Sequence, residues 1–225
     1  MTGVPDWLAP LVSAAGSVRP EQLSRMPSPA GGGRASAVLV LFGESAQGPD
    51  LLLIERSAAL RSHAGQPAFP GGAVDPADDG PVAAALREAR EETGLDPAGV
   101  DVLATLPALS VPPSGFVVVP VLAWWRNPSV VGPVDTAEVA AVVRVPIAEL
   151  ADPAHRVLVR HPSGRSGPAF EVGGLLVWGF TAGLIDRLLA LAGWERPWSP
   201  GPVRELPAEV RRLATRTATV AGGGP

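Results

Sequence analysis

Three glutamates near the middle of the chain have the spacing most suggestive of chemistry. Glu88, Glu91 and Glu92 stand at positions i, i+3 and i+4, and on a helix this spacing places their carboxylates on one face. Packing anions together costs about 0.2–0.5 kcal/mol per neighbouring pair, and Arg87 offsets only part of that cost through Glu91. A bound Mg²⁺ or Mn²⁺ would offset more, because these ions prefer carboxylate, water and phosphate oxygens. On their own, however, three glutamates favour a solvated acidic helix face over a metal site.

The residues around the glutamates predict a short helix with defined ends. Pro81 suits a first helical turn, where its missing N–H would have no partner anyway. Gly94 suits the left-handed position that closes a helix. Gly71 and Gly72 precede the helix and would let the backbone curve closely around a site. The pattern is therefore loop–helix–loop.

The segment from Arg87 to Leu95, REAREETGL, resembles the box of the Nudix hydrolases, GX5EX7REUXEEXGU, in which U is aliphatic. It matches REUXEEXGU at every fixed position, with a small Ala89 at U. Asp78 stands where the box has its first Glu, and eight residues rather than seven separate it from Arg87. Both departures resemble the variant of the coenzyme A pyrophosphatase branch, in which a GGxxDPxD run precedes the helix.

A second motif lies directly upstream. Residues 52–72 read LLIERSAALRSHAGQPAFPGG, which is similar to the signature of the same branch, close to LLTxR[SA]xxxRxxxGxxxFPGG. Only Ile54 departs, at a position where Thr is expected. Two adjacent motifs that match over this length favour the coenzyme A pyrophosphatase branch over an accidental likeness.

The resemblance implies metal-dependent hydrolysis of the pyrophosphate bond of coenzyme A or acyl-CoA. The products would be 3′,5′-ADP and (acyl-)4′-phosphopantetheine, and the cofactor Mg²⁺ or Mn²⁺. Transferred residue by residue, Glu88, Glu91 and Glu92 bind the metal, and one of them, or Glu138, orients or deprotonates the attacking water. Arg87 would hold a metal-binding glutamate in place. For Glu138 the alternative is an acid favoured by the dipole at a helix start.

The substrate-binding candidates are two arginines, the glycine pair and one aromatic residue. Arg56 and Arg61 lie in the upstream motif and could grip phosphates bidentately, the 3′-phosphate among them; the alternative is surface ion pairing. Gly71 and Gly72 would allow the substrate close to the backbone. Phe116 could stack on an adenine, but filling the core is the preferred interpretation.

Three other functions stay open. The first is a Nudix pyrophosphatase acting on another nucleoside diphosphate derivative or related nucleotide, such as ADP-ribose, NADH or an oxidised dNTP. The second is a non-catalytic Nudix module that binds a nucleotide, although a pure binder has little use for the charge of Glu88, Glu91 and Glu92. The third is a structural or interaction protein, supported only by the apolar N-terminal segment.

Composition limits the classes of partner and the cellular location that we expect. The net charge of −4 gives no basic excess for nucleic-acid binding. The absence of cysteine excludes disulfides and thiolate chemistry. No apolar run is long enough to span a bilayer, and the N-terminus lacks the pattern of a signal peptide. We therefore expect a cytoplasmic protein whose partner is a small-molecule nucleotide, without nucleic acid or membrane; a homodimer stays open.

The expected fold is α+β, an α/β/α sandwich with a mixed sheet between helices, as the family resemblance also implies. Strands are predicted around residues 35–42, 50–54, 100–106, 117–125 and 143–145, followed by a hairpin over 155–161 and 169–178 and a helix ending at Leu191. We expect an N-terminal helical and linker segment over 1–33, a Nudix domain over 34–195 and a frayed Pro/Gly-rich tail over 196–225.

Overall fold

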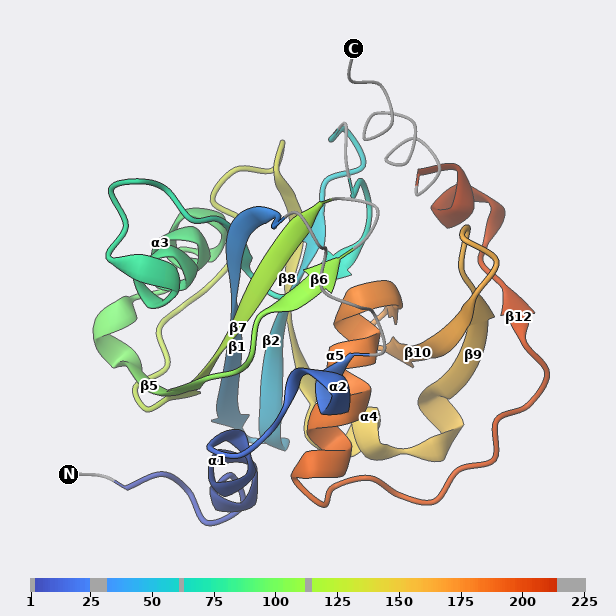
Figure 1. The fold of residues 1–225 in the computed structure, drawn as a ribbon, viewed down its shortest axis with the longest axis horizontal. Helices are drawn as coiled ribbons and strands as arrows, with labels where there is room; N and C mark the ends of the chain where they lie inside the picture. Colours follow the sequence, from blue (N-terminus) through green and yellow to red (C-terminus); the bar gives the residue numbers. More distant parts are fainter. Residues whose placement is uncertain (1–2, 25–31, 61–62, 112–114, 214–225) are drawn as a thin grey trace.

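The computed structural model describes residues 3–24, 32–60, 63–111 and 115–213. A mixed main sheet lies between α3 on one face and α1, α2, α4 and α5 towards the other, with a smaller second sheet beyond α5 (Figure 1). This confirms the expected α+β sandwich. Among the described residues, no helix combines the length and apolar character needed to cross a membrane.

The main sheet combines antiparallel pairs with one parallel pair. Its order is β3-β2-β1-β7-β5, and β4 pairs with β1, β6 with β7 and β8 with β2. β1 and β7 run parallel, whereas β1 with β2, β2 with β8 and β5 with β7 run antiparallel. The strands are β1 (Arg34–Ser45), β2 (Gly48–Arg56), β3 (Pro67–Ala68), β4 (Gly71–Ala73), β5 (Val100–Thr105), β6 (Leu109–Val111), β7 (Phe116–Trp125) and β8 (Val139–Pro146).

β1 is apolar at consecutive positions because both of its faces are covered. Successive side chains of a strand point to opposite faces, so Val40 and Phe42 enter the core beneath α5, whereas Leu39 and Leu41 enter the core beneath α3. Each of these side chains is at most 1% exposed. A strand covered on both faces needs apolar residues at consecutive positions, and this strand holds the sheet that supports the site.

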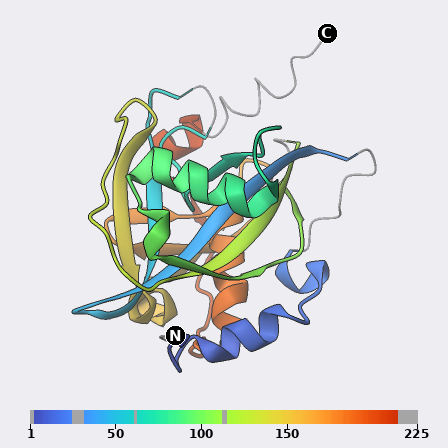
Figure 2. The same ribbon diagram turned by 90° about the vertical axis from the view of Figure 1, so that its left-hand side faces the viewer.

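Helix α3 (Gly80–Thr93) has the ends predicted from its sequence. A proline lies at its start, and Gly94 closes it in the left-handed conformation with φ +71°. Ala84, Ala85 and Ala89 are fully buried against the sheet. Because these side chains are small, the helix backbone can approach the strands closely. The helix lies across the strands of the main sheet (Figure 2) and contacts β4.

The other face of the main sheet is covered mainly by apolar helices. The helices are α1 (Ala9–Ala15), α2 (Pro20–Leu23), α4 (Ile147–Ala151) and α5 (Gly179–Leu191), with short 3₁₀ turns at Pro97–Gly99 and Pro153–His155. The second sheet has the order β11-β10-β9-β12. Its strands are β9 (Arg156–Arg160), β10 (Ser166–Val172), β11 (Leu175–Val177) and β12 (Arg204–Glu205).

Both ends of the described chain pack on the core. In the N-terminal segment Leu8 and Leu11 are fully buried in the larger core, and Trp7 makes edge contacts with Phe42 and Trp124. At the other end β12 pairs in parallel with β9. Residues 208–213 are helical. The expectation of a frayed tail is therefore wrong for residues 204–213, because backbone pairing and buried apolar side chains hold them.

Candidate active site

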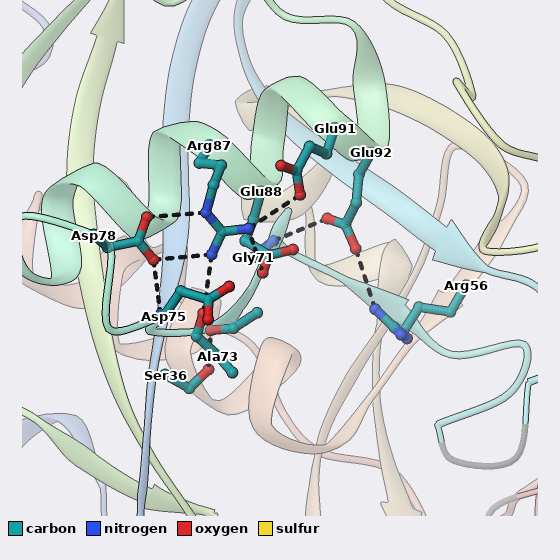
Figure 3. Close-up of polar contacts among 11 residues, drawn as sticks. Ser36, Arg56, Gly71, Ala73, Asp75, Asp78, Arg87, Glu88, Glu91 and Glu92 are labelled. Carbon is teal, nitrogen blue, oxygen red and sulfur yellow. Dashed lines mark hydrogen bonds and ion pairs between the residues drawn. The ribbon is translucent and has the colours of Figure 1, made fainter.

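The polar face of α3 brings the three glutamates together over β4 (Figure 3). Their side chains differ in exposure: 6% for Glu92, 20% for Glu88 and 58% for Glu91. The order follows from the helix, since Glu92 lies nearest the sheet and Glu91 nearest solvent. The three glutamates share one face of α3, as predicted, but their side chains range from buried to exposed.

Arg87 connects this face with the loop before the helix. Its Nε and Nη2 donate to the two carboxylate oxygens of Asp78, each at 2.9 Å, a bidentate pair. Its Nη1 donates to Glu88 Oε1 at 3.1 Å and to Glu91 Oε2 at 3.0 Å, and its Nη2 also reaches the Ala73 carbonyl. The Arg87 hydrogen bonds, and then the backbone N–H of Asp75, lower the pKa of Asp78. Asp78 therefore anchors the arginine that holds two glutamates.

Glu92 is a buried carboxylate with two donors. The Gly71 N–H donates to its Oε2 at 2.9 Å, and Arg56 Nη1 donates to its Oε1 at 3.2 Å. Burial nevertheless raises its pKa to about 7, against the opposing effect of both donors, and the charges of Glu88 and Glu138 add to the rise. Burial also raises the pKa of Glu88. Negative charge in this corner is therefore costly until a cation offsets it.

The glycine pair shapes the floor of the site. Gly71 has φ +156°, and a Cβ there would overlap the Ala37 carbonyl oxygen. A Cβ at Gly72 would instead overlap the Glu88 carboxylate. The Ser36 hydroxyl donates to the Gly72 carbonyl at 2.6 Å and fixes this turn of backbone. Gly71 is thus required by the backbone, and Gly72 by the side chain above it.

A cleft of about 820 Å³ opens beside these residues. This volume lies at the large end of the range of about 300–1,000 Å³ usual for small-molecule sites. Acidic side chains lining it are Glu88, Glu92 and Glu138, and basic or titratable ones are Arg56, His63, His161 and Arg211. Apolar side chains, among them Phe69, Phe116, Trp178 and Phe180, line the rest. The cleft can therefore accept a ligand with charged and apolar parts.

The donor atoms suit a hard divalent cation in type and charge. Glu88, Glu91 and Glu92 offer carboxylate oxygens on one face, and the raised pKa values of Glu88 and Glu92 mark a place where positive charge would be stabilising. Among the residues that the structure describes, no three acidic or histidine side chains converge closely enough to form a ready-made metal cage. Arg87 and Arg56 hold the carboxylates in that arrangement.

The remaining sequence-predicted residues are Glu138, Phe116, Arg56 and Arg61, and the first three line the cleft. Glu138 is exposed in the segment before β8 and lines the cleft. Phe116 is half-buried at the start of β7 and lines it too, with the Arg34 guanidinium 5.5 Å from its ring centroid; it is not a fully buried core residue. Arg56 also lines the cleft, but its observed partner is Glu92. Arg61 lies outside the described residues.

Several cleft residues were missed by sequence reasoning. Ser36, His161, Trp178 and Arg211 line the cleft but come from four segments far apart in the chain. Asp78 was recognised only as a departure from the motif, whereas its carboxylate makes the bidentate pair with Arg87. The position of the acidic Asp78 shortly before the helix could have indicated this pair. The other residues carry no local signal.

Comparison with known proteins gives a consistent result. The NUDIX domain family matches residues 33–186. A protein named Nudix hydrolase NudL from Cronobacter sakazakii is 44% identical over 171 residues, covering 73% of this chain and 85% of its own. NudL from Escherichia coli is 40% identical over 167 residues, covering 71% and 83%. The crystal structure of the Nudix hydrolase RenU from M. smegmatis shares the fold, with a TM-score of 0.52 and 22% identity over 72% of this chain and 88% of that one.

Proposed function

This chain belongs to the Nudix hydrolase family, and on that premise we propose that it cleaves the pyrophosphate bond of coenzyme A or an acyl-CoA. Water adds to one phosphorus, the bond from that phosphorus to the bridging oxygen breaks, and the proton of the water passes to a carboxylate. The products are 3′,5′-ADP and (acyl-)4′-phosphopantetheine. Nudix hydrolases act on nucleotide-derived small molecules and use divalent metals, so the proposal specifies the substrate within that class.

The observation that carries the coenzyme A assignment is the motif over residues 52–72. Its resemblance to the coenzyme A pyrophosphatase signature is a sequence feature, and the structure adds where its residues lie. Arg56, His63, Gln66 and Phe69 all line the cleft, and Arg56 contacts Glu92. A motif that forms part of the cleft wall can influence which nucleotide is accepted, which supports its use as an indicator of substrate.

The proposed metal ligands are Glu88, Glu91 and Glu92, with Mg²⁺ or Mn²⁺. When bound, such an ion offsets phosphate charge and lowers the pKa of the attacking water. Arg87 orients Glu88 and Glu91 through hydrogen bonds from its Nη1, and Gly71 fixes Glu92 through its N–H. The carboxylate that accepts the proton is one of these glutamates or Glu138, which faces the same cleft.

Arg56 and Phe116 are the proposed substrate contacts that the structure describes. Arg56 holds Glu92 through one Nη atom, so its first role is to position that carboxylate, and a phosphate would share the guanidinium with it. Phe116 presents its ring at the cleft, where a base or the apolar part of an acyl-CoA could pack. Gly71 and Gly72 keep the floor free of side chains at β4.

The test is turnover of a substrate panel with Mg²⁺ and with Mn²⁺: CoA, acetyl-CoA, 3′-dephospho-CoA, ADP-ribose, NADH and 8-oxo-dGTP, with products resolved by chromatography. The variant Glu92→Gln is run beside the wild type, and Glu44→Gln, an exposed glutamate in β1 outside the cleft, is the control. Formation of 3′,5′-ADP from CoA, lost only in Glu92→Gln, is expected.

Other outcomes separate the alternatives. Faster cleavage of ADP-ribose, NADH or 8-oxo-dGTP than of CoA would keep the hydrolase and discard the coenzyme A assignment. Absence of turnover by folded protein that still binds a nucleotide would indicate a non-catalytic module.

A further inference from the structure

Residues 204–213 lie outside the family-matched region, but they bring the chain back to the side of the cleft. The match ends at residue 186, yet β12 aligns with β9 through the register pairs Arg204 with Val159 and Glu205 with Arg160. Leu206, only 3% exposed, joins a small core with Val157 and Trp178. This segment is therefore an integral part of the described fold.

The helical residues 208–213 lie directly against the loop of the upstream motif. A Cβ placed on Gly65 would lie 3.0 Å from Leu213 Cδ1, so the leucine packs on the bare glycine backbone. Val210 packs on the small core around Trp178. Between these two contacts Arg211 lines the cleft. In Figure 1 these residues are the dark-red helix that follows β12.

Arg211 belongs to a wall of the cleft that is distinct from α3. We define the C-terminal wall as His63, His161, Trp178 and Arg211, all of which line the cleft. His161 packs edge-on against Trp178, with 5.0 Å between ring centroids, and His63 lies two residues from the Gly65 contact. None of these side chains is acidic. The cleft thus has a carboxylate-rich α3 side and a side whose ionisable groups are bases.

We propose that the C-terminal wall is a second phosphate subsite, in which Arg211 binds a substrate phosphate that is not part of the bond being cleaved. The inference rests on the proposed function, because coenzyme A carries such a group, its 3′-phosphate. A guanidinium can bind a phosphate bidentately. Arg211 Nη1 lies 3.8 Å from a Glu205 carboxylate oxygen, with both side chains more than half exposed, and an exposed pair of this length is weak. A phosphate dianion in the cleft would offer this guanidinium a bidentate partner.

Arg56 is less suited to this task. Its Nη1 donates to Glu92 at 3.2 Å, which ties its position to the carboxylates of α3. Arg211 belongs to a different element, the helical residues 208–213, in which Leu213 packs on Gly65. A ligand that extends from Glu92 to Arg211 would use both sides of the cleft, as a nucleotide with a third phosphate requires.

The test compares Arg211→Ala with Arg212→Ala, an exposed arginine of the same helical segment that does not line the cleft. Steady-state kinetics are measured on CoA and on 3′-dephospho-CoA. We expect Arg211→Ala to raise KM for CoA about tenfold, as loss of a charge-assisted contact predicts, with KM for 3′-dephospho-CoA and kcat for both substrates unchanged. Arg211→Lys should recover part of the loss, since lysine keeps the positive charge but lacks the planar guanidinium that binds a phosphate bidentately.

Equal KM changes on the two substrates, or none, would overturn the assignment of Arg211 while leaving coenzyme A hydrolysis intact. If the wild type cleaves no CoA, the proposed function fails instead. Calorimetric binding then decides the inference, using 3′,5′-ADP and 5′-AMP as probes. Selective loss of 3′,5′-ADP affinity in Arg211→Ala supports the subsite, whereas equal affinities for wild type and variant reject it.

Discussion

The α3 wall and the C-terminal wall face the same cleft, but they are assembled differently. The α3 wall, which we define as Gly71, Gly72, Glu88 and Glu92, comes from one stretch of chain. The Gly71 N–H donates to Glu92, and Arg87, which does not line the cleft, donates to Glu88. The C-terminal wall draws on segments that lie far apart in the sequence and are held by apolar contacts around Trp178 and Leu206.

This difference separates chemistry from recognition. The proposed chemistry depends on a few oxygen atoms held at short range, and a single helix with its preceding loop can supply them. Recognition of a large nucleotide requires contacts across the whole cleft, which only distant parts of the chain can provide. We therefore expect substitutions in the α3 wall to reduce kcat, and substitutions in the C-terminal wall to change KM or pH dependence.

The largest effect is expected for Glu92→Gln. The amide keeps the shape and can still accept the Gly71 N–H, but it removes the charge, so kcat should fall by about 10²–10⁴. The measurement is kcat on the best substrate of the panel, beside the Glu44→Gln control. A fall of less than about tenfold would contradict the central role given to the α3 wall.

The next largest effect is expected for Arg87→Lys. Lysine keeps the charge but cannot donate simultaneously to Asp78, Glu88, Glu91 and the Ala73 carbonyl as Arg87 does. Loss of such a positioning contact typically costs about 10–100-fold in activity or metal affinity. Mn²⁺ affinity and kcat would both be measured.

Arg90→Lys is the matched control for Arg87→Lys, because Arg90 is exposed on the same helix. Similar losses in the two variants would show that the contacts of Arg87 have no special role.

Among the glycines of β4, substitution of Gly71 should mainly reduce stability, whereas substitution of Gly72 should mainly reduce activity. In Gly71→Ala the new Cβ meets the Ala37 backbone oxygen and the residue has φ +156°, so we expect a loss of about 1–3 kcal/mol in the free energy of unfolding. In Gly72→Ala the Cβ meets the end of the Glu88 side chain, which can move. Stability should then change little, while activity falls about tenfold.

Denaturant unfolding and kcat of both glycine variants provide the measurement. The reverse result, with Gly72→Ala the less stable variant and Gly71→Ala the less active, would show that the backbone and side-chain roles have been exchanged.

The smallest effect is expected in the C-terminal wall, for His161→Gln. Burial lowers the pKa of His161 from 6.5, so the unfolded chain binds more protons than the folded protein below that pH. The stability contributed by neutral His161 is present above pH 6.5 and is lost as the pH falls through its folded pKa. The wild type should therefore lose stability relative to His161→Gln as the pH falls below 6.5.

Denaturant unfolding across this pH range measures the difference. The control is His155→Gln, because His155 precedes β9 where His161 follows it, and His155 lies outside the cleft. A difference between wild type and His161→Gln that does not vary with pH would show that His161 is not a partly buried base with a lowered pKa.

Local patterns predicted much of the fold. The helix between Pro81 and Gly94 is confirmed at both ends, since its boundaries depend on residues with strong backbone preferences. The strands around residues 35–42 and 117–125 are confirmed as β1 and β7. The parallel pairing of these two strands could not be inferred from either alone. The packing of residues 204–213 was missed because Leu206 and Val210 give only a weak periodic signal.

The sequence by itself determined the chemical part of the site. The spacing of Glu88, Glu91 and Glu92 and the glycines on either side of their helix act over a few residues, where helix geometry dictates which side chains share a face. Only the tertiary structure decided that Glu92 is buried beside Arg56, with a pKa of about 7, and that Arg211 reaches the same cleft. Burial and charge pairing depend on what lies nearby in space, and residues distant in the chain supply those neighbours.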